Sequence, residues 1–208
     1  MRSLKTPKGM ESKIVARFAH RGRGSVFFGV EFVDLGKPDA VRQALSRLSR
    51  AGTIRRIGTS LYHYPAFNEQ LGGELPPSPE IVAQAIARRT DSRIVATGAL
   101  AANLLGLSTQ VPAKRIYLTN GPSRSINAGS IMLSFRHASP RRMAASGKIS
   151  SLVFEALRYL KRGNVTDAVI ARLQRSLPTE ARMILRRDLR HAAVWMRPLV
   201  LRIIGEQK

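Results

Sequence analysis

One short stretch of the sequence carries side chains that can bind DNA, at the spacing of a helix. Residues 37–65 read KPDAVRQALSRLSRAGTIRRIGTSLYHYP. In a helix, one apolar arc would contain Val41, Ala44, Leu45 and Leu48. The opposite side and its flank would contain Arg42, Gln43, Ser46, Arg47 and Arg50. Arg and Gln can form paired hydrogen bonds with guanine and adenine edges in the major groove, so this polar face is a candidate DNA-reading surface. An ordinary amphipathic helix with a solvated arginine face has the same pattern.

The residues after this helix favour the DNA interpretation. Gly52 is a helix stop. Thr53–Ile57 and Leu61–Tyr64 then read as the two strands of a hairpin around the turn Gly58-Thr59-Ser60. Arg55 and Arg56 lie in the first strand, and the turn offers backbone and hydroxyl donors to phosphates. Tyr62 and Tyr64 are expected to pack the hairpin onto the helices. A helix followed directly by a small basic hairpin is typical of a winged helix-turn-helix.

The preceding elements supply the rest of that fold. The spacing predicts a helix from Met10 to His20-Arg21-Gly22, an extended segment over Ser25–Phe28 and a short helix over Val30–Leu35. Pro38 and Asp39 suit the first turn of the next helix. We therefore predict a flexible basic lead-in over residues 1–9 and a winged-helix DNA-binding domain over residues 10–65.

A change in composition marks the end of this domain. Residues 66–78 contain Gly72-Gly73 and Pro76-Pro77 and are predicted to be a linker. The second domain, residues 79–208, is predicted to contain a helix to about Arg89, a strand over Arg93–Thr97 and a helix over Gly98–Leu107. Strands are expected at Arg115–Thr119 and Ile131–Arg136, with helices following from Ile149, Val165 and Pro178. The predicted fold class is α+β: a winged helix-turn-helix, then a mixed α/β domain with a helical C-terminal end.

The net charge also indicates a polyanionic partner. The 208-residue chain has 35 basic and 13 acidic residues, a formal net charge of +22. The charge is +9 over residues 1–65, +6 over residues 66–148 and +7 over residues 149–208. Positive charge on every part of the chain is typical of a surface that follows nucleic acid. Solubility, or a genomic bias toward Arg, would also produce an excess of this kind.

Other classes of function find little support in the sequence. The absence of cysteine excludes disulfides, thiolate nucleophiles and cysteine-based zinc sites. No apolar run approaches the roughly 18 residues of a membrane span, and the N-terminus lacks the features of a secretory signal. The HExxH, GxSxG and Walker A motifs are all absent. We therefore expect a cytoplasmic protein that is not an enzyme and has no cofactor, no metal site and no membrane partner.

Both halves of the sequence resemble AbiEi-type antitoxins of type IV toxin–antitoxin systems. The first half does so through VRQALSRLSRAGTIRRIGTSLYHYP. The second half does so through TGALAANLLGLSTQVPAKRIYLTNG, residues 97–121, followed by IMLSFRHA. The resemblance covers residues 10–145 and is weaker over residues 149–208. The strong basicity of the second domain departs from the family pattern.

This resemblance implies a bacterial antitoxin that represses its own operon and counteracts a nucleotidyltransferase-type toxin. Its implied partners are double-stranded DNA of its own promoter and the toxin; it implies no catalytic residue. The implied DNA contacts are Lys37, Arg42, Gln43, Ser46, Arg47, Arg50, Arg55, Arg56 and Thr59.

Antitoxin activity is expected mainly after the linker. Candidates for a second basic surface there are Arg172, Arg175, Arg182, Arg186, Arg187 and Arg190. The same residues would also suit the solvated face of a helical bundle. Two other functions fit the sequence: a winged-helix regulator without a toxin, and an RNA-binding protein. The operator sequence, the oligomeric state and direct contact with the toxin are not determined by the sequence.

Overall fold

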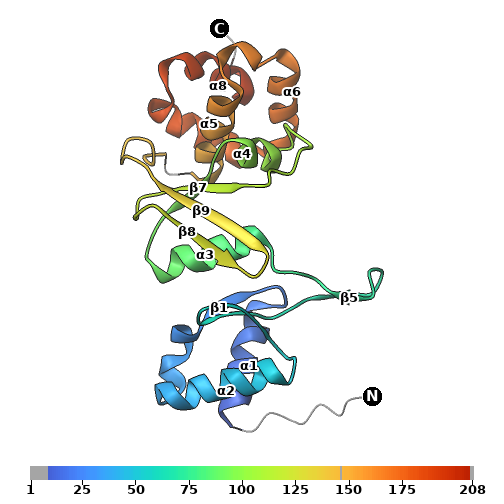
Figure 1. Ribbon diagram of the computed structural model, residues 1–208. Helices are drawn as coiled ribbons and strands as arrows, with labels where there is room; N and C mark the ends of the chain where they lie inside the picture. Colours follow the sequence, from blue (N-terminus) through green and yellow to red (C-terminus); the bar gives the residue numbers. More distant parts are fainter. Residues whose placement is uncertain (1–8, 146, 207–208) are drawn as a thin grey trace. The chain divides into compact units, whose positions relative to one another are not determined.

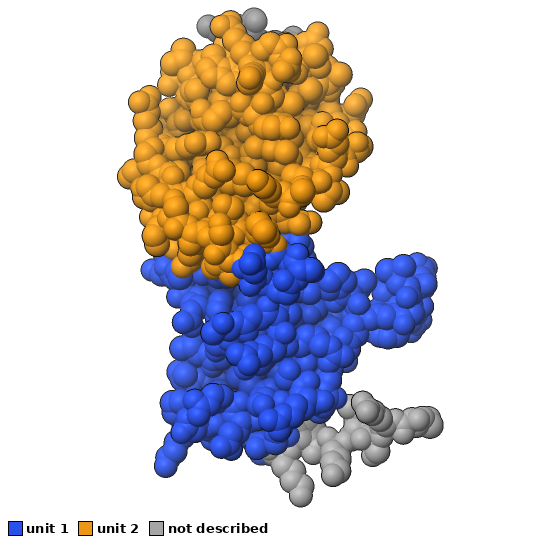
Figure 2. Space-filling model, in the orientation of Figure 1, with its two compact units in different colours: residues 1–91, 127–131 blue, residues 92–126, 132–208 orange. Residues whose placement is uncertain are grey.

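The computed structural model describes residues 9–145 and 147–206, and its fold is mixed α and β (Figure 1). The chain divides into two compact units, which are coloured separately in Figure 2. Unit 1 comprises the chain up to Asp91 together with residues 127–131, and unit 2 comprises residues 92–126 and 132–208. The lead-in predicted over residues 1–9 lies, apart from Gly9, outside the described residues.

Unit 1 begins with two helices that flank a short strand and a 3-10 segment. Its elements are α1 (Met10–Arg21), β1 (Val26–Phe28), the 3-10 helix η1 (Gly29–Leu35), α2 (Pro38–Arg50), β2 (Arg55–Gly58), β3 (Leu61–His63), β4 (Phe67–Asn68), β5 (Gly73–Glu74) and α3 (Pro79–Arg89). The predicted order of elements up to residue 64 is therefore present. The expected short helix at Val30–Leu35 takes the tighter 3-10 form.

Aromatic side chains form the centre of unit 1. Phe18 of α1, Phe27 of β1 and Phe32 of η1 are fully buried. The ring of Phe18 lies 4.3 Å from that of Phe27 and 5.4 Å from that of Phe32, measured between centroids. The apolar arc of α2 packs against the same core. Burial of these large side chains is the main driving force that holds α1, η1 and α2 around β1.

The hairpin joins a three-stranded antiparallel sheet of order β1-β3-β2. Arg55 pairs with His63 and Arg56 with Tyr62, after which a bulge shifts the register so that Gly58 pairs with Leu61. Ser60 in the turn has a φ of 55°, which closes the tight connection between β2 and β3. Because β3 is the central strand, the hairpin is attached to β1 and to the core of unit 1.

The segment predicted to be a linker is partly structured. Strands β4 and β5 form a small antiparallel hairpin within residues 66–78. Helix α3 follows and belongs to unit 1: the guanidinium of Arg88 donates to the Val26 carbonyl at 3.3 Å, and that of Arg89 lies 4.8 Å from the centroid of the Phe28 ring. The observed division after Asp91 thus lies downstream of the boundary predicted at residues 66–78.

A four-stranded sheet forms much of unit 2, although residues 127, 128 and 131 of this sheet are grouped with unit 1. Its elements are β6 (Ile94–Ala96), β7 (Arg115–Thr119), β8 (Arg124–Ala128) and β9 (Ile131–His137), in the order β6-β7-β9-β8, and α4 (Ala99–Leu104) connects β6 to β7. Strands β7 and β9 are parallel, and Arg115 pairs with Leu133. The central strands bury Tyr117, Leu133 and Phe135. Strand β8 lies between the two strands predicted at Arg115–Thr119 and Ile131–Arg136, where no strand was predicted.

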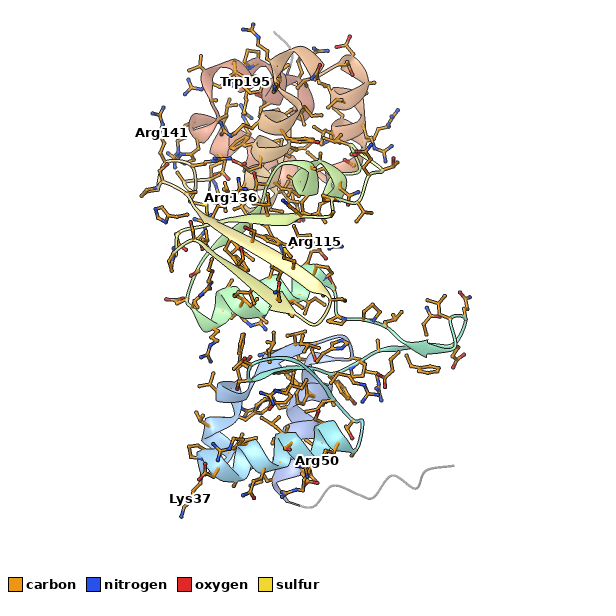
Figure 3. All side chains as sticks on the ribbon, in the orientation of Figure 1. Lys37, Arg50, Arg115, Arg136, Arg141 and Trp195 are labelled. Carbon is orange, nitrogen blue, oxygen red and sulfur yellow. The ribbon has the colours of Figure 1, made fainter. Side chains whose placement is uncertain are left out.

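The rest of unit 2 is a bundle of helices. It consists of α5 (Lys148–Leu160), η2 (Arg162–Asn164), α6 (Asp167–Ser176), α7 (Thr179–Arg187), η3 (Asp188–His191), η4 (Val194–Met196) and α8 (Arg197–Ile204). Val153 and Leu157 of α5 pack with Leu173 of α6, Leu185 of α7 and Val200 of α8 in one core. Trp195 of η4, labelled in Figure 3, packs against this core. None of the helices in the described residues is long and apolar enough to cross a membrane.

Candidate functional site

Helix α2 separates a buried face from an exposed face. Pro38 occupies the first turn, and the buried side chains are Val41, Ala44, Leu45 and Leu48, as predicted. The exposed side chains include those of Lys37, Arg42, Gln43, Arg47 and Arg50. Figure 3 shows Lys37 and Arg50 at the two ends of the helix. The helix therefore presents cationic and amide groups along its whole length, while Ser46 is half-buried.

Two arginines of α2 have carboxylate partners. Arg42 lies 2.9 Å from Asp39, one turn earlier, and both side chains are 76% exposed. Arg47 donates to Glu11 of α1 and so links the two helices. Exposed ion pairs of this kind contribute little to stability and are readily exchanged for other partners. Arg50 has no carboxylate within ion-pair distance in the part of the chain that the structure describes, so its charge is available to an anionic ligand.

The hairpin arginines are exposed and oriented by local contacts. Arg55 donates to the Gly52 carbonyl at 2.7 Å and to Glu74 at 2.7 Å. Arg56 donates through Nε to the Gly58 carbonyl at 3.3 Å. Thr59 at the turn is exposed. The hairpin thus carries two cations and a hydroxyl on a frame fixed to the sheet of unit 1.

Three consecutive side chains of the returning strand and its end are buried. Tyr62 and Tyr64 pack into the core of unit 1, which confirms their predicted packing role. His63 is 2% exposed, and its Nε2 has no hydrogen-bond partner among the described residues. Burial lowers the pKa of His63; the neighbouring Glu74 opposes this shift, and Arg55 reinforces it. His63 is therefore held as a neutral ring behind the basic hairpin.

The second basic surface predicted from the sequence is not one continuous set of free cations. Arg182 donates to the Leu177 carbonyl at 3.0 Å and to the Gln174 carbonyl, so it caps the end of α6. Arg186 pairs with Glu206 at 3.0 Å, and Arg187 lies 3.9 Å from Asp188. Arg172 and Arg175 are exposed on α6. Of the six residues, only Arg190 lines the pocket described next.

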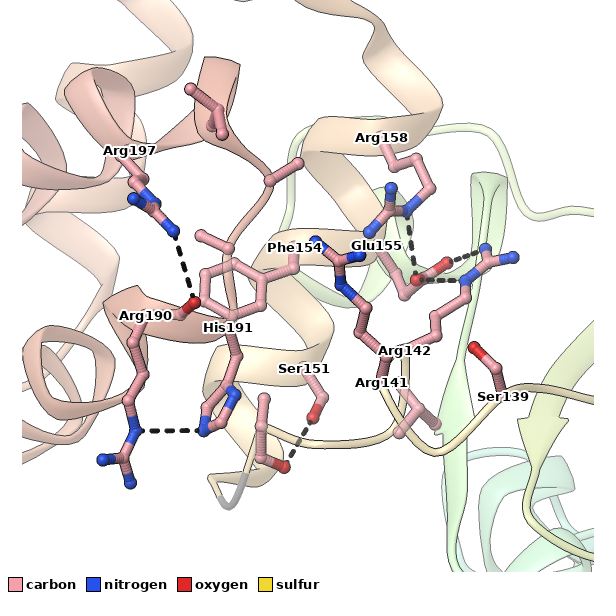
Figure 4. Close-up of a pocket in the computed structure, with 15 residues that line it drawn as sticks. Ser139, Arg141, Arg142, Ser151, Phe154, Glu155, Arg158, Arg190, His191 and Arg197 are labelled. Atoms are coloured by element: carbon pink, nitrogen blue, oxygen red, sulfur yellow. Dashed lines mark hydrogen bonds and ion pairs between the residues drawn. The ribbon is translucent and has the colours of Figure 1, made fainter.

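Unit 2 contains a pocket of about 360 Å³ that is lined by arginine. Figure 4 shows the pocket between the loop after β9, helix α5 and the segment from η3 to α8. Its cationic side chains are Arg141, Arg142, Arg158, Arg190 and Arg197. One carboxylate, Glu155, and the ring of His191 also line it. Five arginines and one carboxylate give the pocket a formal charge of +4.

The carboxylate fixes part of the pocket wall. Glu155 is 3% exposed. Arg142 donates to its two oxygens at 2.9 and 2.6 Å, Thr97 donates through its hydroxyl at 2.5 Å, and Arg158 reaches it at 3.4 Å. Burial alone would raise the pKa of Glu155, but the hydrogen bonds from Arg142 and Thr97 outweigh it, and the pKa is lowered. Glu155 is thus an ionised anchor for two of the arginines.

The chemistry available in the pocket is anion binding. Arginine is protonated at every relevant pH and offers planar pairs of N–H donors to phosphate or carboxylate. Across the described residues, no group of three or more His, Asp or Glu side chains could hold a metal ion. The pocket contains one carboxylate, and that carboxylate is already bound by two guanidiniums.

Sequence reasoning identified one of the five pocket arginines. The pair Arg141-Arg142 follows Ser139-Pro140 in a segment for which no helix or strand was predicted, and adjacent basic residues there are a signal that could have been used. Arg158 and Arg197 are 39 positions apart in sequence, and no spacing rule brings them together. Their proximity depends on how α5 and α8 pack in the helical core.

Comparison with known proteins places most of the chain in one family. The family of unknown function DUF6088 matches residues 13–185, a range that includes α2, the hairpin and the pocket residues up to Arg158 but not Arg190 or Arg197. No curated protein matches the chain.

Proposed function

The chain belongs to the family of unknown function DUF6088, and we propose that it binds double-stranded DNA through α2 and the β2–β3 hairpin. In this proposal the N-terminal unit is a winged helix-turn-helix, with η1 and α2 as the helix pair and β2–β3 as the wing. Binding at its own promoter would repress transcription.

The exposed face of α2 carries this proposal. Arg42, Gln43 and Arg50 are all exposed on α2, outside its buried arc, so the helix offers donors that suit guanine and adenine edges as well as phosphates. The hairpin that follows holds Arg55 and Arg56 outside the core. Helix, turn and basic hairpin follow one another in the order found in winged-helix proteins.

Charge reversal on α2 tests the proposal. Fluorescence anisotropy would measure the affinity for a duplex from the gene's upstream region. The affinity of the full chain would be compared with that of the double variant Arg42→Glu, Arg50→Glu. We expect binding by the full chain and a loss of at least about tenfold in the variant, because two favourable contacts become repulsive. The control is Arg175→Glu in α6 of unit 2. Equal affinity of all three proteins would contradict a DNA-reading role for α2.

Counteraction of a nucleotidyltransferase-type toxin is the second part of the proposal. It rests on the resemblance of residues 97–121 to AbiEi-type antitoxins; these residues include α4 and β7. Co-expression of the full chain with the product of a neighbouring nucleotidyltransferase gene, scored by growth, tests it. Rescue by the Arg42→Glu, Arg50→Glu variant at equal toxin level would assign neutralisation to a part other than α2. No rescue by the wild-type chain would contradict the antitoxin role.

Two further functions remain distinguishable from this proposal. A winged-helix regulator without a toxin would bind the promoter and leave toxin-limited growth unchanged. An RNA-binding protein would bind structured RNA more tightly than the promoter duplex at the same salt concentration. The same anisotropy assay, with an RNA hairpin of equal length as competitor, separates the two.

A further inference from the structure

The arginine pocket of unit 2 has no part in the proposed DNA contacts, and we propose that it binds a small oligophosphate: free pyrophosphate or the phosphate chain of a nucleotide. Arg141, Arg142, Arg158, Arg190 and Arg197 would supply the donors. The proposal is independent of the DNA-binding role, since it rests on residues of unit 2 alone.

The first support is uncompensated charge. Arg141, Arg190 and Arg197 have no carboxylate within ion-pair distance among the described residues, and Glu155 serves Arg142 and Arg158. Like charges around one small cavity repel each other, so folding keeps them together at a cost. A ligand with three or four negative charges would match the formal charge of +4 and relieve that repulsion. A monoanion would not.

The second support is that several donors are held in place before any ligand arrives. Glu155 fixes the guanidinium of Arg142 through two hydrogen bonds. Arg197 donates to the Arg190 carbonyl at 3.5 Å, and the Arg190 guanidinium donates to the His191 ring at 3.3 Å. These dashed contacts are visible in Figure 4. Donors that are already oriented lose less conformational entropy on binding, which favours affinity.

The loop that carries Arg141 and Arg142 is also anchored. Met143 and Ala145 are 4% and 3% exposed, and the backbone N–H groups of Arg142 and Met143 both donate to the Ser139 carbonyl. The buried side chains hold the loop down while the two arginines extend into the pocket. This arrangement differs from a solvated arginine face, in which the arginines of a single helix point to solvent.

The third support is size. About 360 Å³ lies at the lower end of the range of small-molecule sites. A concave site of this volume suits a pyrophosphate or a nucleotide better than a duplex, which needs an extended convex or groove-matching surface. Ser139 also lines the pocket and carries a hydroxyl donor. Size and charge together favour an oligophosphate over a strand of nucleic acid.

Isothermal titration calorimetry on the full chain tests the proposal. The probes are sodium pyrophosphate and ATP, with sodium sulfate at equal ionic strength as the reference anion. Two pocket variants are tested: the double variant Arg141→Ala, Arg197→Ala and the single variant Arg141→Glu. The control is Arg175→Ala on α6, and circular dichroism checks that each variant is folded. Arg175 is exposed in the same unit and does not line the pocket.

We expect saturable binding of pyrophosphate or ATP and weaker binding of sulfate. The double variant and Arg141→Glu should each weaken binding by about tenfold or more, because each lost charge-assisted hydrogen bond is worth about that factor. Arg175→Ala should change the affinity by less than about twofold, because the charge of a distant, exposed side chain is largely screened by salt. Tighter binding of ATP than of pyrophosphate would identify a nucleotide as the ligand. Tighter binding of pyrophosphate would identify a free oligophosphate.

Three results would overturn the proposal. Absence of saturable binding by both probes is one. Equal losses in the pocket variants and in Arg175→Ala would be another, since binding would then follow net charge. In the third, the pocket variants weaken binding of a nucleic acid duplex while neither small probe binds, which would assign these arginines to a nucleic-acid surface.

Discussion

Glu155 is a point at which several parts of unit 2 meet. It is buried, it accepts hydrogen bonds from Arg142, Arg158 and Thr97, and these donors come from a loop, from α5 and from the end of β6. One carboxylate therefore connects three parts of unit 2. A buried charge of this kind is costly unless its partners are retained, so the whole group is expected to act together.

Replacement of Glu155 by Gln should destabilise the protein by about 1–3 kcal/mol at neutral pH, because three donors lose an ionised acceptor. The lowered pKa means that this contribution is present above pH 4.5, the ordinary value, and is lost as the pH falls through the lowered pKa. Urea unfolding of wild type and variant at neutral and acidic pH measures it. The exposed Glu180→Gln on α7 is the control, and a pH-independent difference would contradict the assignment.

His63 should make unit 1 less stable in mild acid. Its pKa is lowered by burial, with Glu74 raising it and Arg55 lowering it further. Below pH 6.5 the unfolded chain binds a proton that the folded ring resists. Stability should therefore rise with pH between the lowered pKa and 6.5.

The measurement is the urea midpoint followed from about pH 5 to about pH 8, the range in which histidine titrates. His63→Phe should flatten this dependence, and His20→Phe, at an exposed position of α1, should leave it unchanged. An equal slope in the wild type and in His63→Phe would show that other groups are responsible for the pH dependence.

At the scale of elements, α2 and the hairpin should contribute differently to DNA binding. Arg42 lies on the exposed face of the helix, where base edges can be reached, and Arg56 lies in the hairpin, where contacts to the DNA backbone are commoner. Arg42→Ala should cost about 1–3 kcal/mol on the operator and less on random DNA, whereas Arg56→Ala should weaken both equally. Anisotropy titrations measure the affinity of each variant for the two duplexes. Equal losses of Arg42→Ala on both duplexes would show that Arg42 contacts phosphate and not base edges.

Local signals in the sequence were sufficient for most helices and for the hairpin. Helix α2 has an apolar arc, Pro38 at its start and Gly52 after its end, so its pattern, start signal and stop signal agree. Strand β8, by contrast, is rich in small and polar residues and pairs in a sheet whose order is not sequential. The 3-10 segments at Asp188 and Val194 interrupt the last helical region and separate α8 from α7.

The candidate sites differ in how far they could be predicted. The α2 surface is contiguous in sequence, and a helical period is enough to place Arg42 and Arg50 on one side. The pocket joins a loop, α5, η3 and α8, which are distant in sequence. Bringing Arg158 near Arg197 requires the packing of Leu157 and Val200 in a shared core, which is a tertiary effect that periodicity does not contain.

For the whole molecule, the net charge of +22 should dominate the dependence of DNA binding on salt. If about 6–10 phosphates are neutralised, affinity should fall by about 10³–10⁵ between about 50 and 200 mM salt, through release of counterions. Arg50→Ala should reduce the slope of log affinity against log salt concentration by about one, because one phosphate contact is lost. Anisotropy at several salt concentrations measures the slope, and salt-insensitive binding would contradict an electrostatic mode.

The position of the single tryptophan makes the two units spectroscopically distinct. Trp195 packs against the core of unit 2, whereas the aromatic core of unit 1 consists of phenylalanine and tyrosine. Excitation at the red edge of the tryptophan absorption band does not excite tyrosine. The fluorescence of Trp195 therefore reports the unfolding of unit 2 alone, while far-ultraviolet circular dichroism reports the helices of both units. In a urea titration, separated curves would reveal two cooperative folding units, and coincident curves would mean that neither unit unfolds without the other.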